Sequence, residues 1–399
     1  MKLEALPPLS LYVHIPWCVR KCPYCDFNSH ENAAALPENE YVARLLLDLE
    51  SALPSVWGRR LGSVFIGGGT PSLFSPQAID ALLSGVRARL PLEPGAEVTV
   101  EANPGTVEAR RFHGFRDAGV TRVSIGVQSF DERMLAALGR IHGADEARRA
   151  IAAALECFDS VNIDLMYGLP GQSLEMARAD IEEAARAGAP HVSAYQLALE
   201  PNTVFWSKPP SLPEHDLCAD MQLLVEATLS QYAHYETSAF AKPGHRCRHN
   251  LNYWEFGDYI GIGAGAHGKI SFADRITRHE RAKQPAAYLA ADVAVANRTV
   301  PERELPFEFM LNALRLVEGF PPRLFEERTG LPLAAIERPL NAAESKGLLE
   351  RDWNFLRPSA RGRRFLNDLL DLFLAEEKPG PAAAAAASGR VIPITAERR

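Results

Sequence analysis

The chain has 399 residues, of which 47% are hydrophobic and 23% charged, so it can bury a sizeable core and is not broadly disordered. Its 50 acidic and 43 basic side chains give a net charge of −7, which argues against a protein that coats nucleic acid. Six cysteines are too few for a disulfide scaffold, and no apolar run is long enough for a transmembrane helix. The first ten residues lack the basic start and apolar core of a secretory signal.

Short β-branched segments alternate with helical segments over the first 200 residues. The predicted strands cover residues 11–15, 64–66, 98–102, 122–127, 161–166 and 192–199. Apolar side chains recur at helical spacing between them, as in Tyr41, Leu45, Leu46 and Leu49, and Ser173 is a plausible N-cap for a later helix. Six strand–helix units in series imply a parallel sheet with right-handed crossovers. Eight units close a complete barrel, so six predict an α/β fold with an incomplete (βα)6 barrel of the TIM type.

The rest of the chain divides by composition and periodicity into three further parts. Residues 201–300 start with a Pro-rich connector and continue through a helix at 217–229 to short strands and loops. Residues 301–377 combine helices with a possible hairpin, 348–350 with 355–357, in the order of a winged-helix-like domain. Residues 378–399 contain six consecutive alanines followed by polar residues, which predicts a disordered or weakly helical tail.

Three cysteines, Cys18, Cys22 and Cys25, follow the first predicted strand within eight residues. Three thiolates on one short loop can converge on a soft metal centre. A structural zinc site needs a fourth ligand, and neither His14 nor His30 lies at a spacing typical of zinc. The odd number of cysteines also argues against disulfides. The pattern therefore favours an iron–sulfur cubane that leaves one iron open to a small molecule.

The spacing Cys-x3-Cys-x2-Cys after a first strand resembles the radical S-adenosylmethionine superfamily. This resemblance implies that Cys18, Cys22 and Cys25 hold a [4Fe–4S] cluster whose open iron chelates S-adenosylmethionine. One electron from the reduced cluster then cleaves the sulfonium to give a 5′-deoxyadenosyl radical. The protein orients the cofactor and excludes water.

Polar residues and glycines follow the other predicted strands, where barrel proteins place their sites. Gly67–Gly69 and Thr70 follow the second strand, and Glu101, Gln128 and Asp164 end the next three. By the resemblance, Tyr12, Gly68 and Glu101 contact the cluster-bound S-adenosylmethionine. The positions that match a second S-adenosylmethionine site are Gly69, Thr70, Gln128, Arg140 and Asp164.

Four longer motifs resemble one branch of the superfamily, which contains oxygen-independent coproporphyrinogen III oxidases and the HemW haem chaperones. They start at Tyr12, Glu101, Gly126 and Asp164, and the resemblance spans roughly residues 10–375. The oxidase pattern has another cysteine two residues beyond the third, where this chain has Phe27. The oxidase also carries an N-terminal extension, whereas only about ten residues precede the first strand here. Both departures argue against decarboxylation.

The segment His249-Asn-Leu-Asn-Tyr253-Trp254 resembles a signature of the haem chaperones in which the histidine is implicated in haem binding. Imidazole is a common axial ligand of haem iron, and aromatic rings can pack on the macrocycle. We therefore predict His249 as the haem ligand. Cys247 and His245 are the alternative ligands, and a structural histidine beside core aromatics is the alternative role.

The leading hypothesis is a radical S-adenosylmethionine-type haem chaperone that binds a [4Fe–4S] cluster, S-adenosylmethionine and haem and delivers haem to acceptor proteins. These acceptors can be membrane-associated, a reductant serves the cluster, and a homodimer is compatible with this function. The alternative is an oxygen-independent coproporphyrinogen III oxidase, an oxidoreductase of porphyrin biosynthesis. A third hypothesis is a winged-helix regulator with an iron–sulfur sensor. An exposed cluster loop implies a reducing interior, so the expected location is the cytoplasm.

Overall fold

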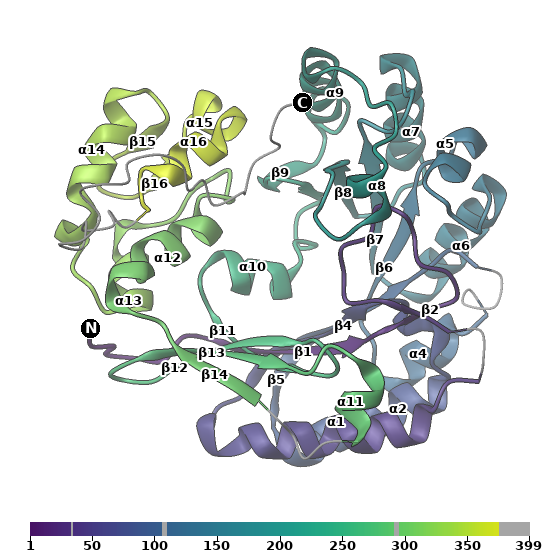
Figure 1. Cartoon of the computed structure of the whole chain (residues 1–399), viewed down its shortest axis with the longest axis horizontal. Coiled ribbons are helices and arrows are strands. Elements are labelled where there is room, and N and C mark those ends of the chain that lie inside the picture. The colour runs from purple at the N-terminus through teal and green to yellow at the C-terminus, as the bar shows by residue number, and fades with distance from the viewer. Residues whose placement is uncertain (33–34, 106–109, 291–294, 375–399) are drawn as a thin grey trace.

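The computed structural model describes residues 1–32, 35–105, 110–290 and 295–374, and the tail predicted at 378–399 lies outside them (Figure 1). A curved sheet of 12 strands forms the centre of the described part. Its strand order is β14-β13-β12-β11-β1-β4-β5-β6-β7-β8-β10-β9.

The middle of this sheet is the predicted incomplete barrel. Its strands are β1 (Leu9–Ile15), β4 (Leu61–Gly68), β5 (Leu92–Ala102), β6 (Arg122–Gln128), β7 (Ser160–Tyr167) and β8 (His191–Gln196). Each pairs with the next in parallel. All six predicted strands and the (βα)6 order are thus confirmed, because the buried β-branched runs that indicated them line both faces of the sheet.

Helices cover the outer face of the barrel (Figure 1). They are α1 (Glu38–Ala52), α2 (Pro76–Arg89), α4 (Phe112–Ala118), α5 (Glu132–Ala137), α6 (Ala144–Cys157), α7 (Leu174–Arg186) and α9 (His215–Thr228). Tyr41, Leu45 and Leu49 of α1 are fully buried as predicted, whereas Leu46 is only partly buried. The Ser173 side chain accepts a hydrogen bond from the Met176 amide, which confirms it as the N-cap of α7.

Further strands extend the sheet at both edges. Outward from β1, the order is β11 (Asp258–Ile262), β12 (His267–Ser271), β13 (Ile276–Arg281) and β14 (Val295–Thr299). Outward from β8, the order is β10 (Ala239–Ala241) and then β9 (Ala233–Glu236). The pairing of β11 with β1 is parallel, and the outer strands pair antiparallel. The strands of the second predicted part therefore continue the sheet of the first. The predicted boundaries at residues 200 and 300 stay predictions.

The C-terminal part has its own core and the predicted order of helices followed by a hairpin. It contains α12 (Leu305–Ala313), α13 (Pro322–Thr329), α14 (Glu337–Ser345), β15 (Leu349–Arg351), β16 (Leu356–Pro358), α15 (Ala360–Arg364) and α16 (Leu366–Asp371). The rings of Phe320 and Phe325 pack edge-on against Phe309 at its centre. Helix α10 (Arg248–Trp254) lies between this part and the barrel (Figure 1).

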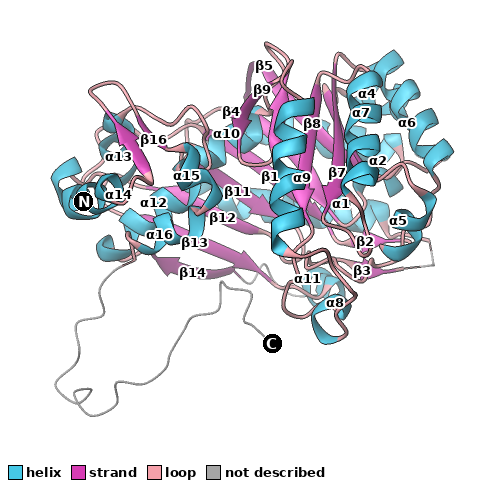
Figure 2. Cartoon of the chain, turned by 90° about the horizontal axis from the view of Figure 1, so that it is seen from above, coloured by secondary structure: helices cyan, strands magenta, loops and turns pink. Residues whose placement is uncertain are grey.

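Short elements complete the described structure, and several gather beside the cysteine loop (Figure 2). They are β2 (Trp17–Cys18), β3 (His30–Glu31), α8 (Val204–Ser207), α11 (Pro285–Ala290) and the 3-10 turns 53–55, 71–73, 302–304 and 333–336. Among the described helices, none combines the length and apolar character needed to span a bilayer.

Candidate cofactor site

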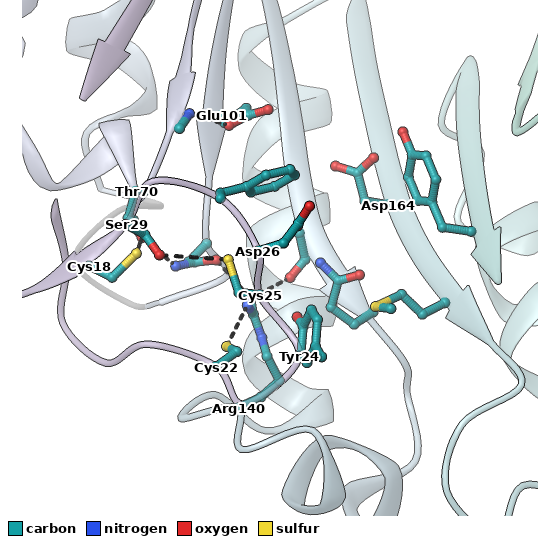
Figure 3. Close-up of a pocket in the computed structure, with 18 of the residues that line it drawn as sticks. Cys18, Cys22, Tyr24, Cys25, Asp26, Ser29, Thr70, Glu101, Arg140 and Asp164 are labelled. Carbon is teal, nitrogen blue, oxygen red and sulfur yellow. Dashed lines mark hydrogen bonds between the residues drawn. The ribbon is translucent and has the colours of Figure 1, made fainter. Parts of the chain in front are cut away.

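A cavity of about 310 Å³ opens at the carboxyl ends of the barrel strands (Figure 3). All predicted site residues line it except Tyr12 and His249. Those that do are Cys18, Cys22, Cys25, Gly68, Gly69, Thr70, Glu101, Gln128, Arg140 and Asp164. Segments far apart in the sequence meet here because parallel strands present their carboxyl ends to the same edge of the sheet.

The cysteine loop is held in place at several points. The short strands β2 and β3 pair, which closes the loop at its base. Within the loop, the Lys21 ammonium donates to the carbonyls of Phe27 and Ser29 at 3.3 and 3.1 Å. The Asn28 amide donates to the carbonyls of Ala264 and Lys283. These bonds tie the loop to itself and to the segments after β11 and β13.

Each of the three thiols has a polar side chain beside its sulfur. Thr70 Oγ1 donates to Cys18 Sγ at 3.4 Å, and Arg140 Nη1 lies 3.6 Å from Cys22 Sγ. Ser29 Oγ lies 3.6 Å from Cys25 Sγ. Burial raises the pKa of Cys18 and Cys25, so without a metal these side chains are protonated. The neighbouring donors favour the thiolate form that an iron–sulfur cluster requires.

The cysteines suit a cluster better than a single metal ion. Within the described ranges, no three His, Cys, Asp or Glu side chains converge on one point. A mononuclear zinc site needs such convergence, whereas a cubane takes each thiolate on a different iron. The three thiols are free, partly exposed and open to one cavity. The donor set therefore fits a [4Fe–4S] cluster.

The glycine run after β4 forms a closely packed wall of the cavity. Gly68 has a φ of +116°, and a Cβ atom there would lie 2.6 Å from the His14 ring. A Cβ on Gly67 would lie 2.9 Å from Glu101 Oε2. The positive φ and the close approach of His14 require glycine at position 68, and a side chain at position 67 would have to displace the Glu101 carboxylate. The amide of Gly68 donates to Glu101 Oε2 at 3.0 Å, which joins the run to the carboxylate.

Two partly buried carboxyl groups give the cavity its electrostatic character. Desolvation, with the nearby Asp164 charge, raises the pKa of Glu101 to about 7. Burial also raises the pKa of Asp164, against the effect of its hydrogen bonds from Ser124 and Asn162. Both groups can accept hydrogen bonds from a cationic ligand, whose charge would repay part of their desolvation.

Tyr12 and His249 lie inside the barrel and outside the cavity. Tyr12 OH is 2.9 Å from His14 Nδ1, and the His14 ring packs against Gly68. His249 is 1% exposed, and burial lowers its pKa to about 3. Its Nδ1 lies 2.9 Å from Ser63 Oγ and its Nε2 lies 3.2 Å from Tyr253 OH. Both ring nitrogens are thus hydrogen-bonded, and the role of His249 as a haem ligand stays a prediction.

Several cavity residues were not singled out from the sequence. Tyr24, Ser29, Asn103 and Tyr195 line the cavity with the predicted set. Arg140 Nη2 donates to Asn103 Oδ1 and to the Gly126 carbonyl, both at 2.7 Å. Asn103 lies within the Glu101-Ala-Asn-Pro-Gly motif, so its position beyond a strand end was a usable signal. Ser29 carried no such signal, because only folding brings it to the Cys25 sulfur.

Comparisons with known proteins agree with this geometry. Two families match the chain, the Radical SAM superfamily over residues 12–184 and the HemN C-terminal domain over residues 300–365. Heme chaperone HemW of Escherichia coli strain K12 is 52% identical over 379 residues, covering 93% of this chain and 99% of that protein. Heme chaperone HemW of Haemophilus influenzae is 48% identical, covering 94% of this chain and 100% of that protein.

A solved structure supports the fold independently. Coproporphyrinogen III oxidase (HemN) from Escherichia coli, described as a radical SAM enzyme, superposes with a TM-score of 0.77. The match covers 92% of this chain and 90% of that one at 24% identity. At this identity the likeness concerns the arrangement of helices and strands, which is that of the predicted α/β fold.

Proposed function

Because the chain belongs to the HemW family of haem chaperones within the radical S-adenosylmethionine superfamily, we propose that it binds haem and delivers it to acceptor proteins. The observation that carries this proposal is near-complete alignment with a haem chaperone at 52% identity, together with three free thiols around one cavity. Superfamily membership implies a [4Fe–4S] cluster and S-adenosylmethionine. The assignment of residues to these groups below is part of the proposal.

Cys18, Cys22 and Cys25 would hold the cluster, and the cavity beside them would hold S-adenosylmethionine. When bound, the reduced cluster can supply one electron to the sulfonium. The protein's own part is to bind and orient. Gly68 and Glu101 form one wall, and Arg140 from the loop after α5 and Asp164 from β7 also line the cavity. Tyr12 acts from behind this wall, since it contacts His14, whose ring packs against Gly68.

The affinity for S-adenosylmethionine is expected to depend on pH through Glu101. Its pKa of about 7 in the empty cavity means that ligand binding must compete with a proton. A cationic ligand favours the ionised carboxylate, so affinity should level off above pH about 7 and fall up to about tenfold per pH unit below it. Equilibrium dialysis of the cluster-loaded protein from pH 6 to 8 measures this. Glu101→Gln should bind more weakly and lack this dependence; an unchanged pH profile in Glu101→Gln would exclude Glu101 as the titrating group.

Ser29 is expected to raise the reduction potential of the cluster. A donor to a ligating sulfur stabilises the more negative reduced state, so Ser29→Ala should lower the midpoint potential by some tens of millivolts, from about 1 kcal/mol for one hydrogen bond. An EPR-monitored redox titration measures the shift. Thr99→Val is the matched control, because it removes a buried hydroxyl that has no hydrogen-bond partner. Equal potentials in wild type and Ser29→Ala would contradict the assignment.

Helix α10 is the proposed haem-binding element, with His249 as ligand. Ser63 Oγ donates to Ser10 Oγ, which leaves the Ser63 oxygen to accept the Nδ1 proton of His249. Nε2 then carries the lone pair that iron requires. To bind iron, Nε2 would have to give up its hydrogen bond with Tyr253 OH. The ring centroids of Phe65 and Tyr253 lie 5.0 and 4.8 Å from that of the imidazole, so the proposed ligand is surrounded by aromatic side chains.

The alternative ligands have less suitable surroundings. Cys247 is fully buried, and burial raises its pKa to about 12, so it is a thiol and not the thiolate that binds haem iron. His245 is partly exposed on the loop before α10 and is the ligand to test if His249 fails.

Haem transfer is tested by mixing haem-loaded protein with an apo-cytochrome and following the absorption of the acceptor. We expect transfer by the cluster-loaded protein. The oxidase alternative is tested in the same preparation with coproporphyrinogen III, S-adenosylmethionine and a reductant. We expect no carbon dioxide release, because Phe27, which is 60% exposed at the cavity, stands where the oxidase pattern has a further cysteine. Clear turnover with no haem transfer would overturn the proposal. The proposal also includes a reductant that serves the cluster and assembly of the chain into a homodimer.

A further inference from the structure

A chain of buried hydrogen bonds runs inside the barrel from the cofactor cavity to helix α10. It starts at the Asp164 carboxylate, which lines the cavity. Asp164 Oδ1 accepts from Asn162 Nδ2 and Oδ2 accepts from Ser124 Oγ, both at 2.8 Å. Asn162 Nδ2 also donates to Ser124 Oγ at 2.7 Å. The two carboxylate oxygens are therefore fixed by side chains one layer deeper in the barrel.

The middle of this chain has a defined donor–acceptor direction. Asn162 Oδ1 lies 2.5 Å from His191 Nδ1, and since the amide oxygen can only accept, Nδ1 carries the proton. Burial lowers the pKa of His191, so the ring is neutral and Nε2 is an acceptor. Tyr235 OH lies 2.8 Å from Nε2 and donates to it. The Tyr235 oxygen in turn accepts the Cys247 amide proton at 3.3 Å.

The far end of the chain is the start of the helix that carries His249. Cys247 is the N-cap residue of α10. The Glu97 carboxylate accepts from the amides of Arg248 and His249 at 3.1 and 3.2 Å. Helix N-terminal amides need such partners, so Tyr235 and Glu97 together fix where α10 begins. The buried Arg122 guanidinium interacts with the charges of Glu97 and Asp164 and spans the same interior.

We propose that His191 and Tyr235 are positioning residues that couple S-adenosylmethionine binding at Asp164 to the placement of α10 and its His249. The coupling to haem rests on the proposed function. Asn162, His191 and Tyr235 are buried, and a hydrogen bond in such an interior is costly to leave unmade. A ligand that hydrogen-bonds to the Asp164 carboxylate changes how its oxygens accept from Asn162 and Ser124. The series of hydrogen bonds through His191 and Tyr235 then transmits this change to the Cys247 amide. Linkage requires haem binding to affect S-adenosylmethionine binding equally.

Hydrogen exchange of the α10 amides tests this coupling without haem. In cluster-loaded protein, S-adenosylmethionine should change the exchange rates of residues 247–254 by about threefold or more. Tyr235→Phe keeps the ring and removes the hydroxyl, so it should abolish that change. Tyr232→Phe is the matched control, because its buried hydroxyl donates to the Ala189 carbonyl, outside the chain, and it should behave as wild type.

Haem titrations with and without S-adenosylmethionine form the second measurement. We expect the two haem dissociation constants of wild type to differ by about fivefold or more and those of Tyr235→Phe to agree. Unchanged α10 exchange in wild type on adding S-adenosylmethionine, or a full response in Tyr235→Phe, would overturn the positioning role. If α10 exchange responds fully but the haem affinity does not depend on His249, the assignment of His249 as haem ligand is overturned. The positioning role of His191 and Tyr235 then stands. Because the exchange result for wild type needs no variant, poor folding of Tyr235→Phe cannot leave the proposal undecided.

Discussion

Replacing Cys18, Cys22 and Cys25 together by alanine is expected to abolish the brown iron–sulfur chromophore and the bound iron and sulfide of the reconstituted protein. Each thiol is a free side chain at the cavity, with Thr70, Arg140 or Ser29 as a polar neighbour of its sulfur. The loop itself is tied by backbone and by Lys21 and Asn28, so the fold should survive the loss of the sulfurs. Iron and sulfide analysis with absorption spectroscopy measures the result.

Cys157→Ala and Cys218→Ala are the controls for this experiment. Both cysteines are buried in the outer helices, and neither lines the cavity. They should keep the full chromophore, with a modest loss of stability from the smaller side chain. A cluster retained in the triple variant would show that these three cysteines do not hold it.

The second large effect is expected at His249. His249→Ala should weaken haem binding about tenfold or more, which is at least about 1.4 kcal/mol, and remove the spectrum of a histidine-ligated haem. The cluster should be unaffected, because His249 does not line the cavity. Haem titration followed by absorption measures the affinity, and iron and sulfide analysis checks the cluster.

Two further variants separate ligation from folding. His249→Ala removes the imidazole that hydrogen-bonds to Ser63 and Tyr253 inside the barrel, which costs stability by itself. His249→Gln can satisfy one of them and still cannot replace imidazole on iron, so it should lose haem equally. His215→Ala, on the exposed start of α9, should bind haem as wild type does. Full haem affinity in His249→Gln would point to His245 or another residue as the ligand.

Local patterns predicted those parts of the site that the strands themselves position. Glu101 and Gln128 lie at the ends of β5 and β6, and Asp164 lies three residues before the end of β7, so strand order brings all three side chains to one cavity. The cysteine spacing and the glycine run are likewise local. Residues on these elements lie around one cavity because a parallel sheet aligns the ends of its strands.

The surroundings of His249 depended on contacts that no local pattern contains. Its motif predicted a haem ligand, and Ser63 on β4 and Tyr253 on α10 hydrogen-bond to its two ring nitrogens inside the barrel. The contact between Ser63 and His249 spans 186 positions of the sequence. The same holds for Ser29 at Cys25 and for Tyr235 between His191 and Cys247.

The sequence by itself determined the fold class, the six barrel strands, the cysteine loop and the strand-end residues, because these follow from periodicity and spacing within short segments. Only the tertiary structure decided that β11 pairs with β1 and that α10 lies against the barrel interior with His249 buried. Pairing between strands nearly 250 positions apart, and the partner of each buried polar atom, depend on packing across the whole molecule. A short segment fixes its own conformation far more strongly than it fixes its distant neighbours.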